Sequence, residues 1–120
     1  MITAVDSSVI LDLLTDDPTF ASNSELALRK AIEQGKLVVC ECVVAEVYPS
    51  LKNRSQFIEF LSDWQLEFSP MDIKSSCLAG EYLSAYLSRG GKAKRVGPDF
   101  LIGAHAIVTA DRLLARDRDI

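Results

Sequence analysis

Four acidic side chains stand where a folded chain can bring them together. Asp6 follows a short apolar run, residues 2–5, and Asp117 follows another near the end of the chain. Glu46 falls at the border of an apolar helical face, and Asp99 opens an almost wholly apolar segment. Sets of carboxylates suit hard divalent cations. We therefore expect these four acids to hold Mg²⁺ or Mn²⁺, as one ion or two.

Each acid also has a purely structural explanation. Asp6 is a good cap for the helix that follows it, and the helix dipole favours an acid such as Asp99 in a first turn. Asp117 lies in an Arg-Asp-Arg-Asp stretch typical of a surface, and Asp119 replaces it if the register shifts by two residues. A carboxylate beside an apolar surface, such as Glu46, costs free energy unless it is paired or binds a metal. The metal-site interpretation depends on all four acids together.

The histidine and the cysteines are weaker candidates than the acids for a catalytic or metal-binding role. His105, the single histidine, lies among apolar residues in the middle of a predicted helix, so we expect it to pack and not to act as a base. The cysteines Cys40, Cys42 and Cys77 have no disulfide spacing and are expected to be free thiols. A zinc site on the first two would need further soft ligands, which are scarce here.

Basic residues gather just before Asp99. Four of them fall within seven positions that contain no acid: Arg89, Lys92, Lys94 and Arg95. We expect them, with Arg116, to contact the phosphates of a nucleic acid, which positions the strand without reading its sequence. A solvated loop after a helix is the alternative. The net charge of −4 is neutral once the four site acids are set aside, so it does not argue against this role.

The elements that must position these residues alternate along the chain. Predicted strands cover residues 2–5, 37–40, 66–68 and 113–115. Predicted helices cover about residues 7–14, 19–34, 42–51 (broken near Pro49), 54–64, 70–88 and 97–110. For the fifth helix, Ser69 is the expected cap. This alternation predicts a three-layer α/β domain with a parallel sheet, in which ligands collect at the carboxyl ends of the strands.

The chain length of 120 residues predicts a single domain, residues 1–120. No apolar run reaches the roughly 18 residues of a membrane span, and the N-terminus lacks the basic region of a signal peptide. We therefore expect a cytoplasmic protein without a membrane partner.

Four segments resemble, in order and spacing, the motifs of PIN-domain nucleases, in particular the VapC-type toxins of toxin–antitoxin pairs. They are Val-Asp6-Ser-Ser-Val-Ile, Val-Val-Ala-Glu46-Val, Pro-Asp99-Phe-Leu-Ile-Gly-Ala-His-Ala and Leu-Leu-Ala-Arg-Asp117-Arg. The likeness spans nearly the whole chain, and the segment with Asp99 is its most specific part.

The resemblance implies a PIN fold, a central parallel sheet flanked by helices, with the acids converging at the strand ends. Asp6, Glu46 and Asp99 match the three core acids of the family, Asp117 matches the fourth, and Ser8 matches a position that supports the first. The implied activity is Mg²⁺- or Mn²⁺-dependent cleavage of RNA, with 5′-phosphate and 3′-hydroxyl products.

The resemblance also implies two protein partners. A VapB-like antitoxin would cover the acidic cleft, and a second copy of the chain would form a homodimer. Exposed apolar residues of the second and third helices, such as Leu26, Leu28 and Tyr48, are candidates for the dimer surface.

Two departures from the family pattern stand out. Ala115 occupies a position where the family often has Thr or Ser, so hydroxyl support for the fourth acid is missing. The family usually continues through another short strand beyond the position of Ile120. We therefore expect either a chain without its last strand or a sheet edge completed in another way.

Two other functions compete with the nuclease. A PIN scaffold that binds RNA or a protein without cutting is the first, although such a scaffold has little reason to keep like charges together. A phosphoryl-transfer enzyme of the haloacid-dehalogenase type is the second, but its chemistry needs an acid where this chain has Ser8.

Overall fold

The computed structural model describes residues 1–92 and 97–116. Its strands are β1 (Ile2–Val5), β2 (Lys36–Val39), β3 (Leu66–Phe68) and β4 (Arg112–Leu114). Its helices are α1 (Ser7–Leu14), α2 (Ala21–Gln34), α3 (Glu41–Val47), α4 (Arg54–Asp63), α5 (Ile73–Ser88) and α6 (Gly97–Thr109), with a 3₁₀ turn η1 (Tyr48–Ser50). The alternating α/β pattern predicted from the sequence is confirmed.

The four strands form one parallel sheet in the order β3-β2-β1-β4. β1 lies inside the sheet, where Ala4 is in register with Val38 of β2 and with Leu113 of β4. Since all strands run the same way, their carboxyl ends meet at one end of the sheet. α1 begins directly after β1 there, and α3 begins directly after β2.

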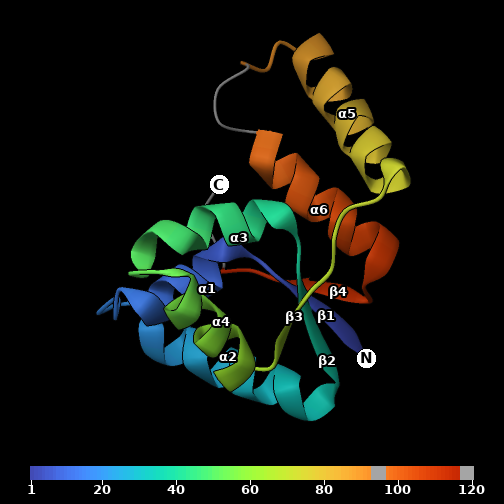
Figure 1. The fold of residues 1–120 in the computed structure, drawn as a ribbon. Helices are drawn as coiled ribbons and strands as arrows, with labels where there is room; N and C mark the ends of the chain where they lie inside the picture. Colours follow the sequence, from blue (N-terminus) through green and yellow to red (C-terminus); the bar gives the residue numbers. More distant parts are fainter. Residues whose placement is uncertain (93–96, 117–120) are drawn as a thin grey trace.

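Helices cover both faces of the sheet (Figure 1). On one face, Val39 joins the main core together with Leu28 of α2 and side chains from α1, α3 and α4. On the other face, Ala4 and Val38 form a smaller cluster with Ala106 of α6. Strand residues alternate between the two faces, so a continuous apolar strand is buried on both sides. The predicted three-layer arrangement is therefore confirmed.

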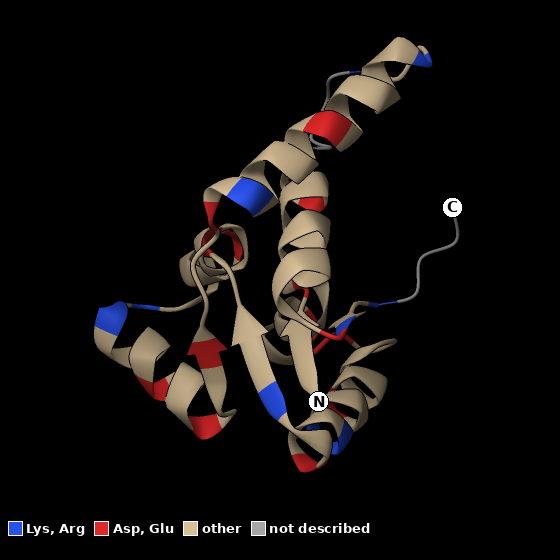
Figure 2. Cartoon of the chain, turned by 90° about the vertical axis from the view of Figure 1, so that its right-hand side faces the viewer, with Lys and Arg blue, Asp and Glu red and all other residues tan. Residues whose placement is uncertain are grey.

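α5 and α6 lie side by side as a hairpin; α6 packs against the sheet, and α5 stands away from it, as Figures 1 and 2 show from two sides. α5 packs mainly against α6, where the rings of Tyr86 and Phe100 meet edge to face at 5.6 Å. Only Ser75 and Ala79 of α5 are buried. α5 therefore adds little to the core of the domain.

The start of α5 differs from the prediction. The helix begins at Ile73, and its cap is Asp72, whose side chain accepts a hydrogen bond of 2.8 Å from the backbone of Ser75. Ser69, the predicted cap, donates its backbone N–H to Val39 of β2 at 2.8 Å and so continues the sheet. The sheet ladder overrides a local helix signal at this point.

One of the residues expected on a dimer surface is in the core. Leu28 is 0% exposed, whereas Leu26 of the same helix is 67% exposed. Tyr48 is half-buried and packs its ring against Phe57. The expectation for Leu28 was wrong, because side chains two positions apart on a helix point in roughly opposite directions.

Within residues 1–92 and 97–116, no helix has the length and apolar character needed to cross a membrane.

Candidate metal centre

Asp6 lies at the carboxyl end of β1 and caps α1. Its backbone N–H donates to Leu114 of β4 at 2.9 Å, which ties it to the neighbouring strand. Its Oδ2 accepts hydrogen bonds from the backbone N–H of Ser8 at 3.2 Å and from the Ser8 hydroxyl at 2.5 Å. The contact expected between Ser8 and Asp6 is therefore present, and it fixes the orientation of the carboxylate.

No basic side chain of the described residues balances the charge of Asp6. The residue is 8% exposed, and no Lys or Arg of the described residues forms an ion pair with it. Both described hydrogen bonds reach Oδ2, so Oδ1 remains available within the described part of the chain. Burying a carboxylate is costly unless it is paired with a cation or binds a metal. An oxygen ligand in this environment fits a hard divalent cation.

Glu46 reaches the same region from α3, which packs against α1. Its Oε1 accepts a hydrogen bond of 2.9 Å from the hydroxyl of Ser7, the residue next to Asp6. Glu46 itself is exposed, so it lies at the accessible side of the site. Two consecutive serines at the start of α1 thus hold one acid each. The partner of Ser7 could not be identified from the sequence, because it lies 39 positions away.

The remaining two acids are not joined to this pair in the described structure. Asp99 is exposed in the first turn of α6, a helix that packs against both β1 and α3. Asp117, with its alternative Asp119, lies outside the described residues. Among the residues that are described, no three His, Cys, Asp or Glu side chains are close enough to hold a metal ion together. The convergence of all four acids stays a prediction.

The segment after β4 contacts Ser8, the residue that orients Asp6. The backbone N–H of Arg116 donates to the Ser8 hydroxyl at 3.2 Å, so the chain passes Ser8 immediately before Asp117. The Arg116 side chain turns inward, with Nη2 3.2 Å from Asp12 Oδ1 and the guanidinium over the ring of Phe20. Asp12 is a buried acid that sequence reasoning did not single out.

The other expected RNA contacts lie around the α5–α6 connection. Arg89 follows α5 directly and is exposed, as is Lys92. Lys94 and Arg95 lie outside the described residues. Figure 2 shows basic residues at the end of the hairpin that lies farthest from the sheet. Arg89 and Lys92 are thus accessible to a phosphate backbone, and the role of all four residues in RNA binding stays a prediction.

His105 is 1% exposed in the middle of α6, which confirms that it packs in the interior. Its Nε2 lies 3.2 Å from Ser69 Oγ and 3.3 Å from Thr109 Oγ1. Burial lowers the pKa of the imidazole, and the weaker influence of Ser69, Glu41 and Asp72 acts in the opposite direction. The neutral form is therefore favoured.

The three cysteines are free thiols in different environments. Cys40 is buried, Cys42 is half-buried and Cys77 is exposed. Burial raises the pKa of the Cys40 thiol. Burial also raises the pKa of the Cys42 thiol, to about 11, and the nearby Cys40, Glu46 and Glu41 act in the same direction. Thiolate ligands are therefore disfavoured at Cys40 and Cys42 near neutral pH.

A three-layer α/β domain with a buried acid at the carboxyl end of its first strand agrees with the PIN fold that the resemblance implied. The sequence matches the PIN domain family over residues 3–120, and the chain belongs to that family. No curated protein sequence gave a significant match.

Solved structures with the same fold include two toxin–antitoxin proteins. VapBC2 from Rickettsia felis, bound to a DNA fragment from its promoter, aligns with a TM-score of 0.72 and 19% identity over 98% of this chain and 88% of that chain. VapBC-1 from nontypeable Haemophilus influenzae aligns with a TM-score of 0.70 and 18% identity, over 98% and 87%. At this level of identity, the similarity establishes the fold.

Proposed function

We propose that this chain is a metal-dependent endoribonuclease, the VapC-type toxin of a toxin–antitoxin pair. The observation that carries the proposal is the buried carboxylate of Asp6 at the carboxyl end of the sheet, without a basic partner among the described residues. A divalent cation would supply the missing charge. Membership of the PIN domain family supports the same reading.

The proposed ligands of Mg²⁺ or Mn²⁺ are Asp6, Glu46, Asp99 and Asp117. When bound, the ion lowers the pKa of a water molecule and stabilises charge on the phosphate. The protein's own part is to hold the acids. Ser8 orients the Asp6 carboxylate, and Ser7 orients that of Glu46. No side-chain nucleophile is needed.

The proposed substrate is RNA, bound along its phosphate backbone. Arg89 and Lys92 are exposed at the far end of the α5–α6 hairpin, and α6 carries Asp99 in its first turn. Lys94 and Arg95 lie between them in the sequence. Cations in this place would position an RNA strand without selecting its sequence. We also propose that the activity is cytoplasmic, as expected for a VapC-type toxin.

The proposed partners are a small VapB-like antitoxin and a second copy of the chain. Both similar structures are named as VapBC proteins, and this supports an antitoxin partner here. A PIN scaffold that binds RNA without cutting it is the second candidate, because three acids are not gathered in the described residues.

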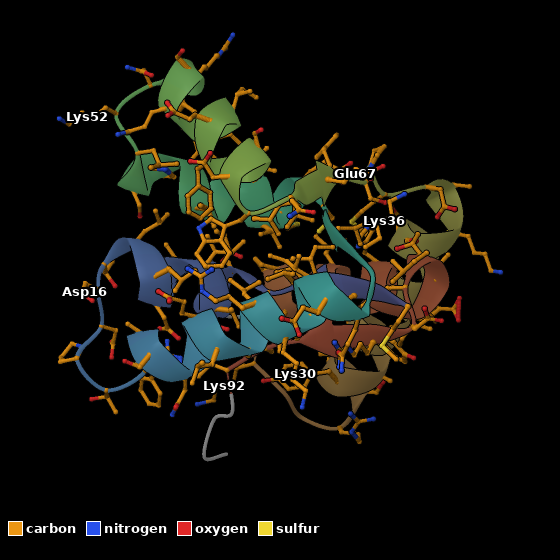
Figure 3. All side chains as sticks on the ribbon, turned by 90° about the horizontal axis from the view of Figure 1, so that it is seen from below. Asp16, Lys30, Lys36, Lys52, Glu67 and Lys92 are labelled. Carbon is orange, nitrogen blue, oxygen red and sulfur yellow. The ribbon has the colours of Figure 1, made fainter. Side chains whose placement is uncertain are left out.

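Cleavage of single-stranded RNA in Mn²⁺ by the wild type, Asp6→Asn and Asp16→Asn tests the proposal. Asp16 is a matched control, since it is an exposed acid in the turn after α1 (Figure 3) with φ of 47°, a conformation that Asn also tolerates. The wild type and Asp16→Asn should cut equally. Asp6→Asn should lose more than about 100-fold in rate, since even residues that only support a metal ligand cost 10–100-fold.

Equal cleavage by Asp6→Asn and the wild type would contradict a metal site at Asp6. RNA binding by the wild type without any cleavage would favour the inactive scaffold.

A further inference from the structure

An ion pair between a buried acid, Asp12, and a half-buried arginine, Arg116, lies beside the candidate metal centre. Asp12, on α1, is 2% exposed. Its Oδ2 accepts a hydrogen bond of 2.8 Å from Ser24 of α2, and its Oδ1 lies 3.2 Å from Nη2 of Arg116. The other two described ion pairs lie at the surface. From its buried position, Asp12 therefore links α1, α2 and the segment that follows β4.

Arg116 is held at three points. Besides the Asp12 contact, its guanidinium carbon lies 4.3 Å from the centre of the Phe20 ring, and its backbone N–H donates to Ser8. Its Nε is buried and makes no hydrogen bond with the described residues. An arginine that binds phosphate needs its donors directed outward. Here one nitrogen is bound to a carboxylate, a second is buried, and one face of the guanidinium is covered by an aromatic ring.

The location of this pair relates it to the candidate acids. Arg116 directly precedes Asp117 in the sequence. Through its backbone it contacts Ser8, the residue that orients Asp6. Movement of the Arg116 backbone would therefore displace both the chain that leads to Asp117 and the support of Asp6.

We propose that Asp12 and Arg116 are positioning residues of the metal centre: their ion pair holds the Arg116 backbone against Ser8, and Ser8 orients Asp6. Arg116 then acts on Asp6 and not on the RNA. The inference rests on the proposed function, because it takes Asp6 as a metal ligand.

Binding of Mn²⁺ to the RNA-free protein, measured by calorimetry, tests this role without depending on catalysis. The variants are Asp12→Asn, Arg116→Met and the double variant. Arg29→Met is the matched control, because Arg29 also combines an ion pair, with Glu25, and an aromatic ring, Trp64, but at the surface of α2.

Both single variants should bind Mn²⁺ about tenfold more weakly or worse, as expected when the support of a metal ligand is lost. The double variant should lose no more than the worse single one, because the two residues act as a unit. Arg29→Met should bind like the wild type. Circular dichroism confirms that each variant is folded, and if Arg116→Met is not, Arg116→Lys replaces it and should also weaken Mn²⁺ binding, because lysine lacks the planar fork.

A direct RNA contact by Arg116 predicts a different result. Arg116→Met would then raise KM for RNA and lower the salt dependence of RNA binding by about one phosphate contact, while Mn²⁺ binding stayed unchanged. That outcome overturns the inference, as does wild-type Mn²⁺ binding in folded Asp12→Asn.

Failure of the inference is distinguishable from failure of the proposed function. If the wild type binds Mn²⁺ and Asp6→Asn does not, the metal centre stands, and unchanged binding in the Asp12 and Arg116 variants overturns the positioning role alone. If Asp6→Asn binds Mn²⁺ as the wild type does, the proposed function fails and this inference fails with it.

Discussion

At the scale of single residues, the first two residues of α1 orient two acids of the candidate site. Ser7 and Ser8 are adjacent and hold Glu46 and Asp6, respectively. A hydroxyl that donates to a carboxylate restricts its rotation, so the acid is already oriented before a metal arrives. The site thus combines two orienting hydrogen bonds with a buried acid that has no basic partner among the described residues.

His105 gives a prediction for pH dependence. Burial holds the pKa of its imidazole below the usual 6.5, so the unfolded chain takes up a proton more readily than the folded one. Stability therefore falls as the pH drops through 6.5. Urea unfolding of the wild type and His105→Gln between pH 7.5 and 5.5 measures this, with a smaller loss of stability expected in the variant. Parallel losses in the two proteins would show that His105 does not contribute.

The contacts that the sequence predicted join residues close together in the chain, and those that it did not predict join residues far apart. The Asp6–Ser8 contact is local, because a helix cap bonds to the residue two positions on. The Ser7–Glu46 and Asp12–Arg116 contacts join residues far apart in the sequence, and a serine or an aspartate alone carries no sign of its partner. Long-range polar pairs depend on the packing of whole helices, which local patterns do not specify.

At the scale of elements, α2 shows how helical periodicity separates core from surface. Leu26 and Leu28 are two positions apart, which places them roughly 200° apart around the helix. Leu28 enters the main core, and Leu26 faces outward. Treating both as exposed was an error that the period of the helix alone would have corrected.

The same pair provides a matched test of the core. Leu28→Ala should lower the free energy of unfolding by about 2–5 kcal/mol, because it leaves a cavity under the sheet. Leu26→Ala should change it by less than about 0.5 kcal/mol. Urea unfolding monitored by circular dichroism measures both values. Similar losses in the two variants would contradict the packing of α2.

Most element boundaries were predictable, because each depends on a few neighbouring residues. The start of α5 was not predictable, because Ser69 donates its backbone N–H to Val39, in a strand some thirty residues earlier, and so belongs to the sheet. The strand order β3-β2-β1-β4 was also beyond the sequence patterns. Strands of three or four residues are too short to reveal which neighbour each will pair with.

At the scale of the whole molecule, the sheet and the helices packed on it, α6 included, form the body of the domain, and α5 projects from it (Figure 1). The main core draws on α1 to α4 and on Ile102 of α6, whereas no residue of α5 is among its buried members. Exposed apolar side chains remain on the hairpin, including Ile73 and Ile107. A helix with few buried apolar contacts unfolds locally at a lower free energy than the sheet.

Hydrogen exchange of the monomer at low protein concentration should show this difference. The amides of α5 should exchange faster than those of β1 and β2, which lie inside the sheet. Mass spectrometry of peptides from the two regions gives the comparison. Equal protection of α5 and β1 would contradict the peripheral place of α5.

The central claim is that distant carboxylates share one divalent cation at the carboxyl end of the sheet. Calorimetric titration of Mn²⁺ into the wild type, Asp6→Asn, Glu46→Gln and Asp99→Asn tests it most directly, with Asp16→Asn as the control. We predict that the wild type and the control bind Mn²⁺ alike and that each of the other three binds about tenfold more weakly or worse. Equal binding by all five proteins, or no binding by the wild type, would contradict the account.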